Sequence, residues 1–281
     1  MKVRIKIIAI VLFSALGLFV ILNFSPWLAL AAALIGIFYL EMIYPKLNFF
    51  SPAILNVKDQ GERAVAITFD DGPSEWTLKI LDHLRDQNVK STFFFLGKNL
   101  ERYPEIAKRA HAEGHTIGIH GYSHTKFHFK GADFIHEDLD RCFKSFQSLG
   151  IKPAALIRFP HGFKNFFAVR DARRRGLTIC SWGKGVWDSK RPGVQTIVDR
   201  SLKLKAGEIL LLHDGDGAKE NPDRSQTVEA LPEIIRGLKA KGFEFVTLDE
   251  RHSRWKKAVK AVGVSSKEIL EECKPFNPIK K

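Results

Sequence analysis

Short runs of apolar residues alternate with longer amphipathic or polar stretches along most of the chain. The runs are rich in β-branched and aromatic residues, which is typical of buried strands. The sequence predicts strands at Ala64–Phe69, Ser91–Leu96, Thr116–Ile119, Ala155–Phe159, Thr178–Trp182, Glu208–Leu212 and Glu244–Leu248. Helices are predicted between them, at Glu75–Gln87, Pro104–Glu113, Phe134–Leu149, Phe166–Arg175, Val194–Leu204 and Thr227–Lys241.

This alternation indicates right-handed βαβ units and a parallel sheet. Seven strands in one domain favour a closed or nearly closed β/α barrel over an open sheet. We assign the barrel domain to residues 62–250 and a preceding linker, which contains two prolines, to residues 45–61. The remaining residues, 251–281, form a basic C-terminal tail.

The N-terminal stretch Ile7–Tyr44 is almost entirely apolar and follows three basic residues. A helix that rises about 1.5 Å per residue crosses the hydrocarbon core in roughly 20 residues, so this stretch is longer than one ordinary span. Because Pro26 interrupts it, we expect residues 1–44 to be a transmembrane anchor that forms a hairpin of two helices, Ile7–Phe24 and Trp27–Tyr44. A single tilted signal anchor and a cleavable signal peptide are the alternatives.

The number of passes decides on which side of the membrane the barrel lies. Basic residues that precede an apolar segment tend to stay in the cytoplasm. Two passes would return the barrel to the cytoplasm, and one pass would export it. We therefore predict a protein of the cell membrane, of the bacterial inner-membrane type, and favour the cytoplasmic face for the barrel.

The composition adds a strong positive charge to this picture. The 281 residues include 44 Lys and Arg against 31 Asp and Glu, a formal net charge of +13. Such a balance favours acidic partners such as phospholipid head groups, anionic glycans or nucleic acids. No stacking motif or helix-turn-helix pattern accompanies the charge, so no nucleic acid is expected, and membrane attachment explains the basic surface. The three widely spaced cysteines exclude a disulfide framework and a cysteine zinc motif.

Candidate chemistry lies at the ends of the predicted strands, where barrels carry their active sites. The first strand ends in two adjacent carboxylates, Asp70 and Asp71. One of them could cap the next helix, but a pair followed by Gly-Pro is hard to explain structurally. His120 and His124 follow the third strand, four residues apart, so both imidazoles share one side if the loop turns helically. Two histidines and one carboxylate with open positions are typical of a catalytic metal site, most commonly zinc.

Four motifs, T-F-D-D-G-P, H-x-x-x-H, R-x-P-x-G and L-x-H, occur in this order and resemble those of the polysaccharide deacetylase family. This family is also known as the NodB-homology or carbohydrate esterase 4 family. The resemblance spans about Ala64 to Leu248. It implies a distorted (β/α)7 barrel that removes N-acetyl, less often O-acetyl, groups from sugars with one divalent metal ion. The expected substrate is N-acetylglucosamine in peptidoglycan, in a surface polysaccharide or in a lipid-linked glycan.

The resemblance also implies a role for each matching residue. Asp71, His120 and His124 would bind the metal, most commonly Zn²⁺, which would polarise the amide carbonyl and acidify a water. Asp70 would act as the catalytic base, and Arg158 would pair with Asp70 and orient it. The positive charge of Arg158 allows a second carboxylate to exist beside Asp71.

The remaining roles concern the leaving group and the substrate pocket. His213 would be the general acid that protonates the leaving amine, and Asp188 would keep it protonated at pH 7. The backbone N–H after Pro160, which belongs to His161, would help to hold the oxyanion. Two apolar residues, Trp182 and Leu211, would form the wall of the acetyl pocket.

Several residues depart from the family pattern or remain outside it. Gly121 stands where Ser or Thr is usual, and His161 where an aromatic residue is typical. Asp188 lies in a segment that matches its motif only loosely. The run Arg173–Arg175 is interpreted as a solvated helix end whose cations lie at the negative end of the helix dipole.

Two other functions compete with deacetylation. One is an amidase or deformylase of the same fold that acts on a lipid-linked or non-sugar substrate, because the active-site residues would be the same. The other is a non-catalytic, membrane-anchored glycan-binding module. That function predicts loss of the base or the acid, whereas both Asp70 and His213 are present.

Overall fold

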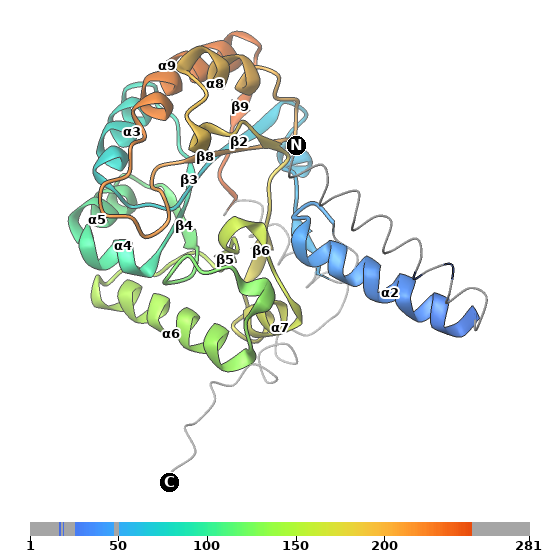
Figure 1. The fold of residues 1–281 in the computed structure, drawn as a ribbon. Helices are drawn as coiled ribbons and strands as arrows, with labels where there is room; N and C mark the ends of the chain where they lie inside the picture. Colours follow the sequence, from blue (N-terminus) through green and yellow to red (C-terminus); the bar gives the residue numbers. More distant parts are fainter. Residues whose placement is uncertain (1–16, 18, 20–25, 48–50, 249–281) are drawn as a thin grey trace, which may run out of the picture.

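The computed structural model describes residues 17, 19, 26–47 and 51–248 of the 281-residue chain. A parallel sheet bends into a distorted half-barrel, and helices cover its outer face (Figure 1). The strands are β1 (Ala53–Ile54), β2 (Ala64–Asp70), β3 (Thr92–Phe95), β4 (Thr116–Ile119), β5 (Leu156–Ile157), β6 (Thr178–Cys180), β7 (Lys184–Gly185), β8 (Ile209–His213) and β9 (Glu244–Phe245). The helices are α2 (Pro26–Ile43), α3 (Glu75–Asp86), α4 (Gly97–Arg102), α5 (Pro104–Ala112), α6 (Ala132–Ser148), α7 (Phe166–Arg174), α8 (Val194–Ser201) and α9 (Ser225–Ala240).

The strands follow the order β1-β6-β5-β4-β3-β2-β8-β7, and β9 pairs with the start of β2. All of these pairings are parallel. The two sides of the half-barrel meet through a single antiparallel bridge between Asn56 and Glu208 instead of a ladder. The sheet is therefore strongly curved, and the carboxyl ends of its strands converge at one end of the barrel.

The alternation of side chains along β2 explains how the sheet separates its two faces. Val65, Ile67 and Phe69 belong to the large core between the sheet and the helices. Ala64 and Ala66 belong to a smaller core inside the barrel, together with residues such as Phe94 from β3. Because side chains of a strand alternate between faces, Thr68 and Asp70 continue the inward-facing row.

The helices begin and end where local sequence dictates. Ser74 caps α3: its hydroxyl accepts a hydrogen bond from the Trp76 N–H, and Thr77 completes a capping box. The Asn165 side chain caps α7 by accepting from Ala168 N at 2.9 Å. Three short 3-10 helices lie next to the candidate active site: η2 (Phe127–Phe129), η3 (Pro160–Gly162) and η4 (Asp188–Lys190).

The seven predicted strands and six predicted helices of the barrel are all present, with ends shifted by a few residues. Three elements, β1, β7 and α4, were not predicted from the sequence. Both missed strands have two residues, too few for a periodic pattern to show. Because β1 pairs with β6, part of the predicted linker at 45–61 belongs to the sheet. The predicted tail, 251–281, lies outside the described residues.

The N-terminal prediction is only partly met. The second predicted helix exists as α2, which projects from the barrel (Figure 1). The first, Ile7–Phe24, lies outside the described residues except for Gly17 and Phe19. Within the part of the chain that the structure describes, no helix has the length and apolar character needed to cross a membrane, so the predicted transmembrane hairpin is not seen there.

Candidate active site

The inward face of the sheet collects the predicted site residues at its carboxyl end. The same alternation that brings Asp70 inward on β2 applies to each neighbouring strand. On β8, Leu210 and Leu212 pack outward, which leaves Leu211 and His213 inward. The inward row at the ends of the other strands comprises His120 after β4, Arg158 after β5 and Trp182 after β6.

Asp71, His120 and His124 form a compact group of three metal-ligand types. One ligand atom from each lies within 4.8 Å of the other two. His124 Nε2 is 2.9 Å and His120 Nε2 is 3.2 Å from Asp71 Oδ1. Asp71 reaches this position because its backbone leaves the strand with φ 75°, and the Asn99 side chain donates to its carbonyl at 2.7 Å. The structure thus brings together the three predicted metal ligands.

The protonation pattern of this group leaves lone pairs that face one another. His120 Nδ1 lies 2.6 Å from the carbonyl oxygen of Arg158, which fixes the proton on Nδ1 in the neutral ring and leaves Nε2 as an acceptor. Asp71 Oδ2 accepts from Gly217 N, whereas the buried Asp71 Oδ1 has no hydrogen-bond partner among the described residues. Acceptors gathered in this way require a cation between them, either a proton or a metal ion.

Neighbouring charges shift the pKa values of Asp71 and His120. Burial by itself raises the pKa of Asp71, but the positive charge of His124 and the close approach of both imidazoles hold it well below its usual range. Burial lowers the pKa of His120, yet Asp70 and Asp71 outweigh burial and raise it. Asp71 and His120 therefore stabilise each other's charged form.

Asp70 is held beside this group by Arg158. The fully buried Arg158 guanidinium donates from one nitrogen to Asp70 Oδ1 at 2.7 Å and to Thr68 at 2.8 Å. Its other terminal nitrogen donates to the carbonyl of Ser181, and its plane lies over the Phe94 ring. Asp70 Oδ2 is left facing His120 Nε2, 3.9 Å away. This arrangement orients one carboxylate oxygen toward the three-residue group, as predicted for the base.

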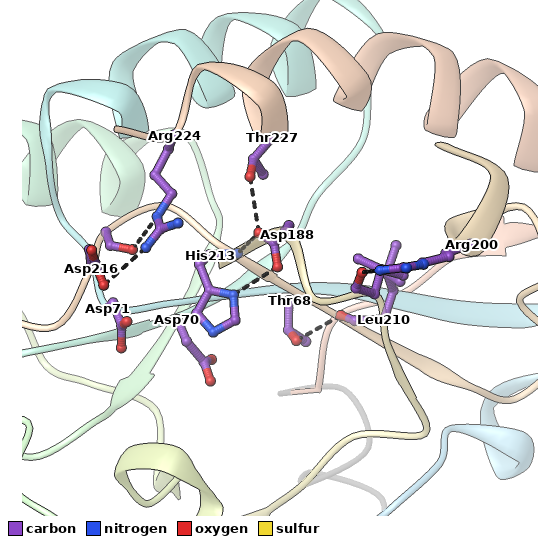
Figure 2. Close-up of polar contacts among 12 residues, drawn as sticks. Thr68, Asp70, Asp71, Asp188, Arg200, Leu210, His213, Asp216, Arg224 and Thr227 are labelled. Carbon is purple, nitrogen blue, oxygen red and sulfur yellow. Dashed lines mark hydrogen bonds and ion pairs between the residues drawn. The ribbon is translucent and has the colours of Figure 1, made fainter. Parts of the chain in front are cut away.

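His213 and Asp188 form a second pair on the opposite side of Asp70. His213 Nδ1 lies 2.9 Å from Asp188 Oδ1, and the backbone N–H of His213 donates to Asp188 Oδ2 at 2.8 Å. Thr227 donates to the same Oδ2 (Figure 2). Burial lowers the pKa of His213, but the charge and hydrogen bond of Asp188 more than offset this and raise it to about 9. The ring is therefore protonated at neutral pH and lies between Asp188 and Asp70 (Figure 2).

One cavity of about 620 Å³ joins these groups. Three of the four predicted pocket residues, His161, Trp182 and Leu211, line it. The His161 ring packs beside a predicted metal ligand, with its centroid 4.4 Å from that of the His124 ring. The fourth, Pro160, is buried and does not line the cavity, because it packs under the loop at Gly121. The role predicted at this position belongs to the backbone N–H that follows Pro160, and it stays a prediction.

Two features of the site were missed. The buried carboxylate of Asp138 on α6 accepts from Tyr122 N at 2.7 Å and from Ser123 N at 3.1 Å, and so fixes the loop that carries both predicted metal-ligand histidines. A Cβ on Gly121 would lie 2.9 Å from this carboxylate, which explains why glycine replaces the usual Ser or Thr. An acidic residue on the buried face of an amphipathic helix was the signal in the sequence.

The second missed feature is the end of α2, because residues 43–46 line the active-site cavity. Lys46 Nζ donates to the Gly183 carbonyl at 2.8 Å. Glu41 is buried, accepts from Ser51 N at 2.8 Å and lies 3.7 Å from Lys164 Nζ. These contacts attach the N-terminal helix to the rim of the site and make it part of the wall.

A glycine substitution can test this attachment. Gly162 and Gly176 have similar positive φ values, 73° and 68°, so alanine strains both backbones alike. Only at Gly162 would the new Cβ meet neighbours, Pro45 at 2.3 Å and Trp182 at 2.7 Å. We expect Gly162→Ala to lower the free energy of unfolding by about 1–3 kcal/mol more than the control Gly176→Ala, measured by denaturant unfolding of the full chain. Equal losses would contradict the packing of residues 43–46 on the barrel.

Comparison with known proteins places this arrangement in a family. The model of the polysaccharide deacetylase family matches residues 57–180. A peptidoglycan-N-acetylglucosamine deacetylase of Bacillus cereus is 38% identical over 194 residues, which cover 67% of this chain and 88% of that protein. The chain belongs to the polysaccharide deacetylase family. The expected family is thus confirmed, and with it the coarse function of a polysaccharide deacetylase, a hydrolase.

Further similarities each cover about two thirds of the chain. A chitooligosaccharide deacetylase of Bradyrhizobium sp. (strain ANU 289) is 33% identical over 203 residues, 68% of this chain and 92% of that protein. The crystal structure of a peptidoglycan N-acetylglucosamine deacetylase in complex with an N-hydroxybenzamide compound superposes with a TM-score of 0.63 at 36% identity. The match covers 67% of this chain and 87% of that one. The distorted half-barrel is therefore the fold of this deacetylase family.

Proposed function

We propose that this polysaccharide deacetylase is a metal-dependent enzyme that removes N-acetyl groups from an amino sugar of peptidoglycan, a surface polysaccharide or a lipid-linked glycan. The observation that carries the proposal is the geometry of one cavity. It joins the Asp71–His120–His124 group, the Asp70–Arg158 pair and the His213–Asp188 pair. These are a cation site, a base and an acid, the three elements that hydrolysis of an amide needs.

The residues fit a divalent metal ion, and zinc is the ion we favour. Asp71, His120 and His124 would hold it, since two imidazole nitrogens and one carboxylate oxygen are a common set in catalytic zinc sites. The orphaned Asp71 Oδ1 and the fixed tautomer of His120 support this choice. When bound, the ion would polarise the acyl carbonyl and acidify a water molecule. The N-hydroxybenzamide bound by the related crystal structure carries a typical metal-chelating group, which agrees with this proposal.

The remaining chemistry belongs to the chain itself. Asp70 would take a proton from the attacking water through Oδ2, while Arg158 holds its other oxygen. The water oxygen forms a bond to the acyl carbon, and the backbone N–H of His161 helps to hold the carbonyl oxygen as it becomes negative. His213 would then give its proton to the amide nitrogen as the C–N bond breaks, so the products are acetate and a free amine. A chitooligosaccharide assay that follows acetate release tests this reaction against deformylation and against glycan binding alone.

Metal removal provides the direct test of the cation site. The purified full chain is expected to contain about one divalent ion, to lose activity in a chelator and to recover it with added zinc, measured by metal analysis and acetate release. His120→Ala and His124→Ala should each weaken metal binding. The control His128→Ala, in the neighbouring η2 turn, should keep the metal. An active chain without an ion would refute metal dependence.

We also infer that the apolar N-terminal region attaches this enzyme to the cell membrane, with the barrel on the cytoplasmic face. The support is the apolar composition of residues 7–44, the basic residues before it and the exposed apolar side chains of α2, among them Trp27, Leu30, Leu34 and Ile35. A topology reporter fused after Lys281 should be active in the cytoplasm. Activity on the outer side would reverse the assigned sidedness, and recovery of the full chain without membranes would refute attachment.

A further inference from the structure

A second cavity, of about 880 Å³, lies between α2 and α7, outside the active-site cavity. Its lining includes apolar side chains from both helices, Phe38 and Met42 of α2 and Phe166 and Val169 of α7. The proposed deacetylation makes no use of this groove. Its walls belong to the two elements that the barrel chemistry leaves unexplained, the projecting apolar helix and the arginine-rich helix.

The lining of the groove also includes cationic side chains. Arg170, Arg173 and Arg174 line it, three exposed side chains that helical spacing brings to the same side of α7 as Phe166. Among the described residues, Arg170 and Arg174 have no ion-pair or hydrogen-bond partner. Arg175, by contrast, pairs with Asp140 and Asp171 on the side of α6.

Among the described residues that line the groove, the one carboxylate does not neutralise these arginines. Glu41 accepts hydrogen bonds from the backbone and hydroxyl of Ser51 and lies 3.7 Å from Lys164, so its charge is already engaged. Arg170 and Arg174, which have no acidic partner among the described residues, therefore give the groove a positive charge. The run Arg173–Arg175 is therefore more than a solvated helix end, because two of its members face an apolar groove.

An apolar lining beside exposed guanidinium groups matches one kind of ligand, an amphiphile with an anionic head. Guanidinium groups bind phosphate oxygens in a bidentate manner, and exposed apolar surface beside them marks a contact with lipid or protein. Beyond the groove, the exposed apolar side of α2 continues away from the barrel through Leu34 and Leu30 (Figure 1). We propose that the groove between α2 and α7 binds an anionic phospholipid, with its phosphate on the arginines and its acyl chains along α2.

Lipid titration of the full chain in non-ionic detergent micelles tests this site. The probe is phosphatidylglycerol, with phosphatidylcholine for comparison, and bound lipid is counted by native mass spectrometry. The triple variant Arg170→Gln/Arg173→Gln/Arg174→Gln is expected to bind phosphatidylglycerol at least about tenfold more weakly, because each basic residue near a lipid surface contributes appreciably to anionic lipid binding. The matched control Lys90→Gln/Lys203→Gln/Arg236→Gln removes the same charge from exposed positions near α3, α8 and α9, on the other side of the barrel (Figure 1). It is expected to change the affinity less than twofold.

Two further measurements distinguish a built lipid site from diffuse charge attraction. Val169→Trp, which fills the groove without changing charge, should also weaken phosphatidylglycerol binding. Glycerol phosphate, the head group without acyl chains, should compete poorly. Equal loss in the two triple variants would show diffuse charge attraction and overturn the proposal, as would tight binding of free glycerol phosphate or of phosphatidylcholine. Thermal unfolding and acetate release by the groove variants should stay near those of the unchanged chain, so failure of the lipid site is distinguishable from failure of the deacetylase proposal.

Discussion

Asp70→Asn is expected to reduce the turnover of an acetylated glycan by about a thousandfold while the chain keeps its metal ion. The structure separates Asp70 from the proposed cation site: its Oδ1 accepts from Arg158, and only Oδ2 faces His120, 3.9 Å away. Asparagine can still accept the hydrogen bond from Arg158, but it cannot take a proton from water, and loss of a general base costs roughly 10²–10⁴ in rate. Acetate release and metal content, measured on the same preparation, check the two halves of this prediction.

Asp71→Asn should give the opposite pattern. Asp71 Oδ1 lies within 3.2 Å of both histidine Nε2 atoms, so its charge is part of the cation site. We expect this variant to lose metal affinity by more than the roughly 10–100-fold that removal of a supporting group costs. Asp216→Asn is the control, because Asp216 lines the same cavity but pairs with Lys219 and Arg224. Equal metal loss in Asp70→Asn and Asp71→Asn would mean that the two roles are shared.

The sequence was sufficient to predict the barrel and most of the site because both follow from strand parity. Once a strand such as β2 is placed, alternation decides that Asp70 faces inward with Ala64 and Ala66, and parallel strands bring their carboxyl ends together. The same rule applies to His120 and to His213. The close approach of His120, Asp71 and Asp70 therefore follows from the position of each residue along or just after its own strand.

The parts that could not be predicted depend on tertiary contacts without a local pattern. The docking of α2 rests on the buried pairing of Glu41 with Lys164 and Ser51, residues that are far apart or unremarkable in the sequence. Pro160 belongs to the expected motif, but its side chain packs below the site because η3 turns with His161 at φ 58°. Short strands such as β1 form because a curved sheet supplies a partner edge, and their own two residues show no period.

Replacement of His213 by alanine should separate two substrates. The amine released from an amide is a poor leaving group and needs a proton, whereas the leaving group of an activated acetyl ester departs without one. His213→Ala is therefore expected to lower acetate release from chitooligosaccharide by roughly 10²–10⁴ and hydrolysis of the activated ester by much less, with the metal still bound. Similar losses on both substrates would show that His213 does not act as the acid.

Asp188, the partner of His213, sets the upper end of the pH range in which deacetylation is expected. His213 has a pKa raised to about 9, so its acid form, and with it the rate, should decline as the pH rises through this value. Asp188→Asn removes the charge that raises the pKa of His213 and leaves the burial that lowers it, so the decline should move to lower pH by about one to three units. A cation at Asp71, His120 and His124 would lower the pKa of His213 in both proteins, so the comparison keeps its sign. The control Asp199→Asn removes an exposed charge and should leave the profile in place. If the decline of the rate at high pH does not move in Asp188→Asn, the pairing with Asp188 is not what keeps His213 protonated.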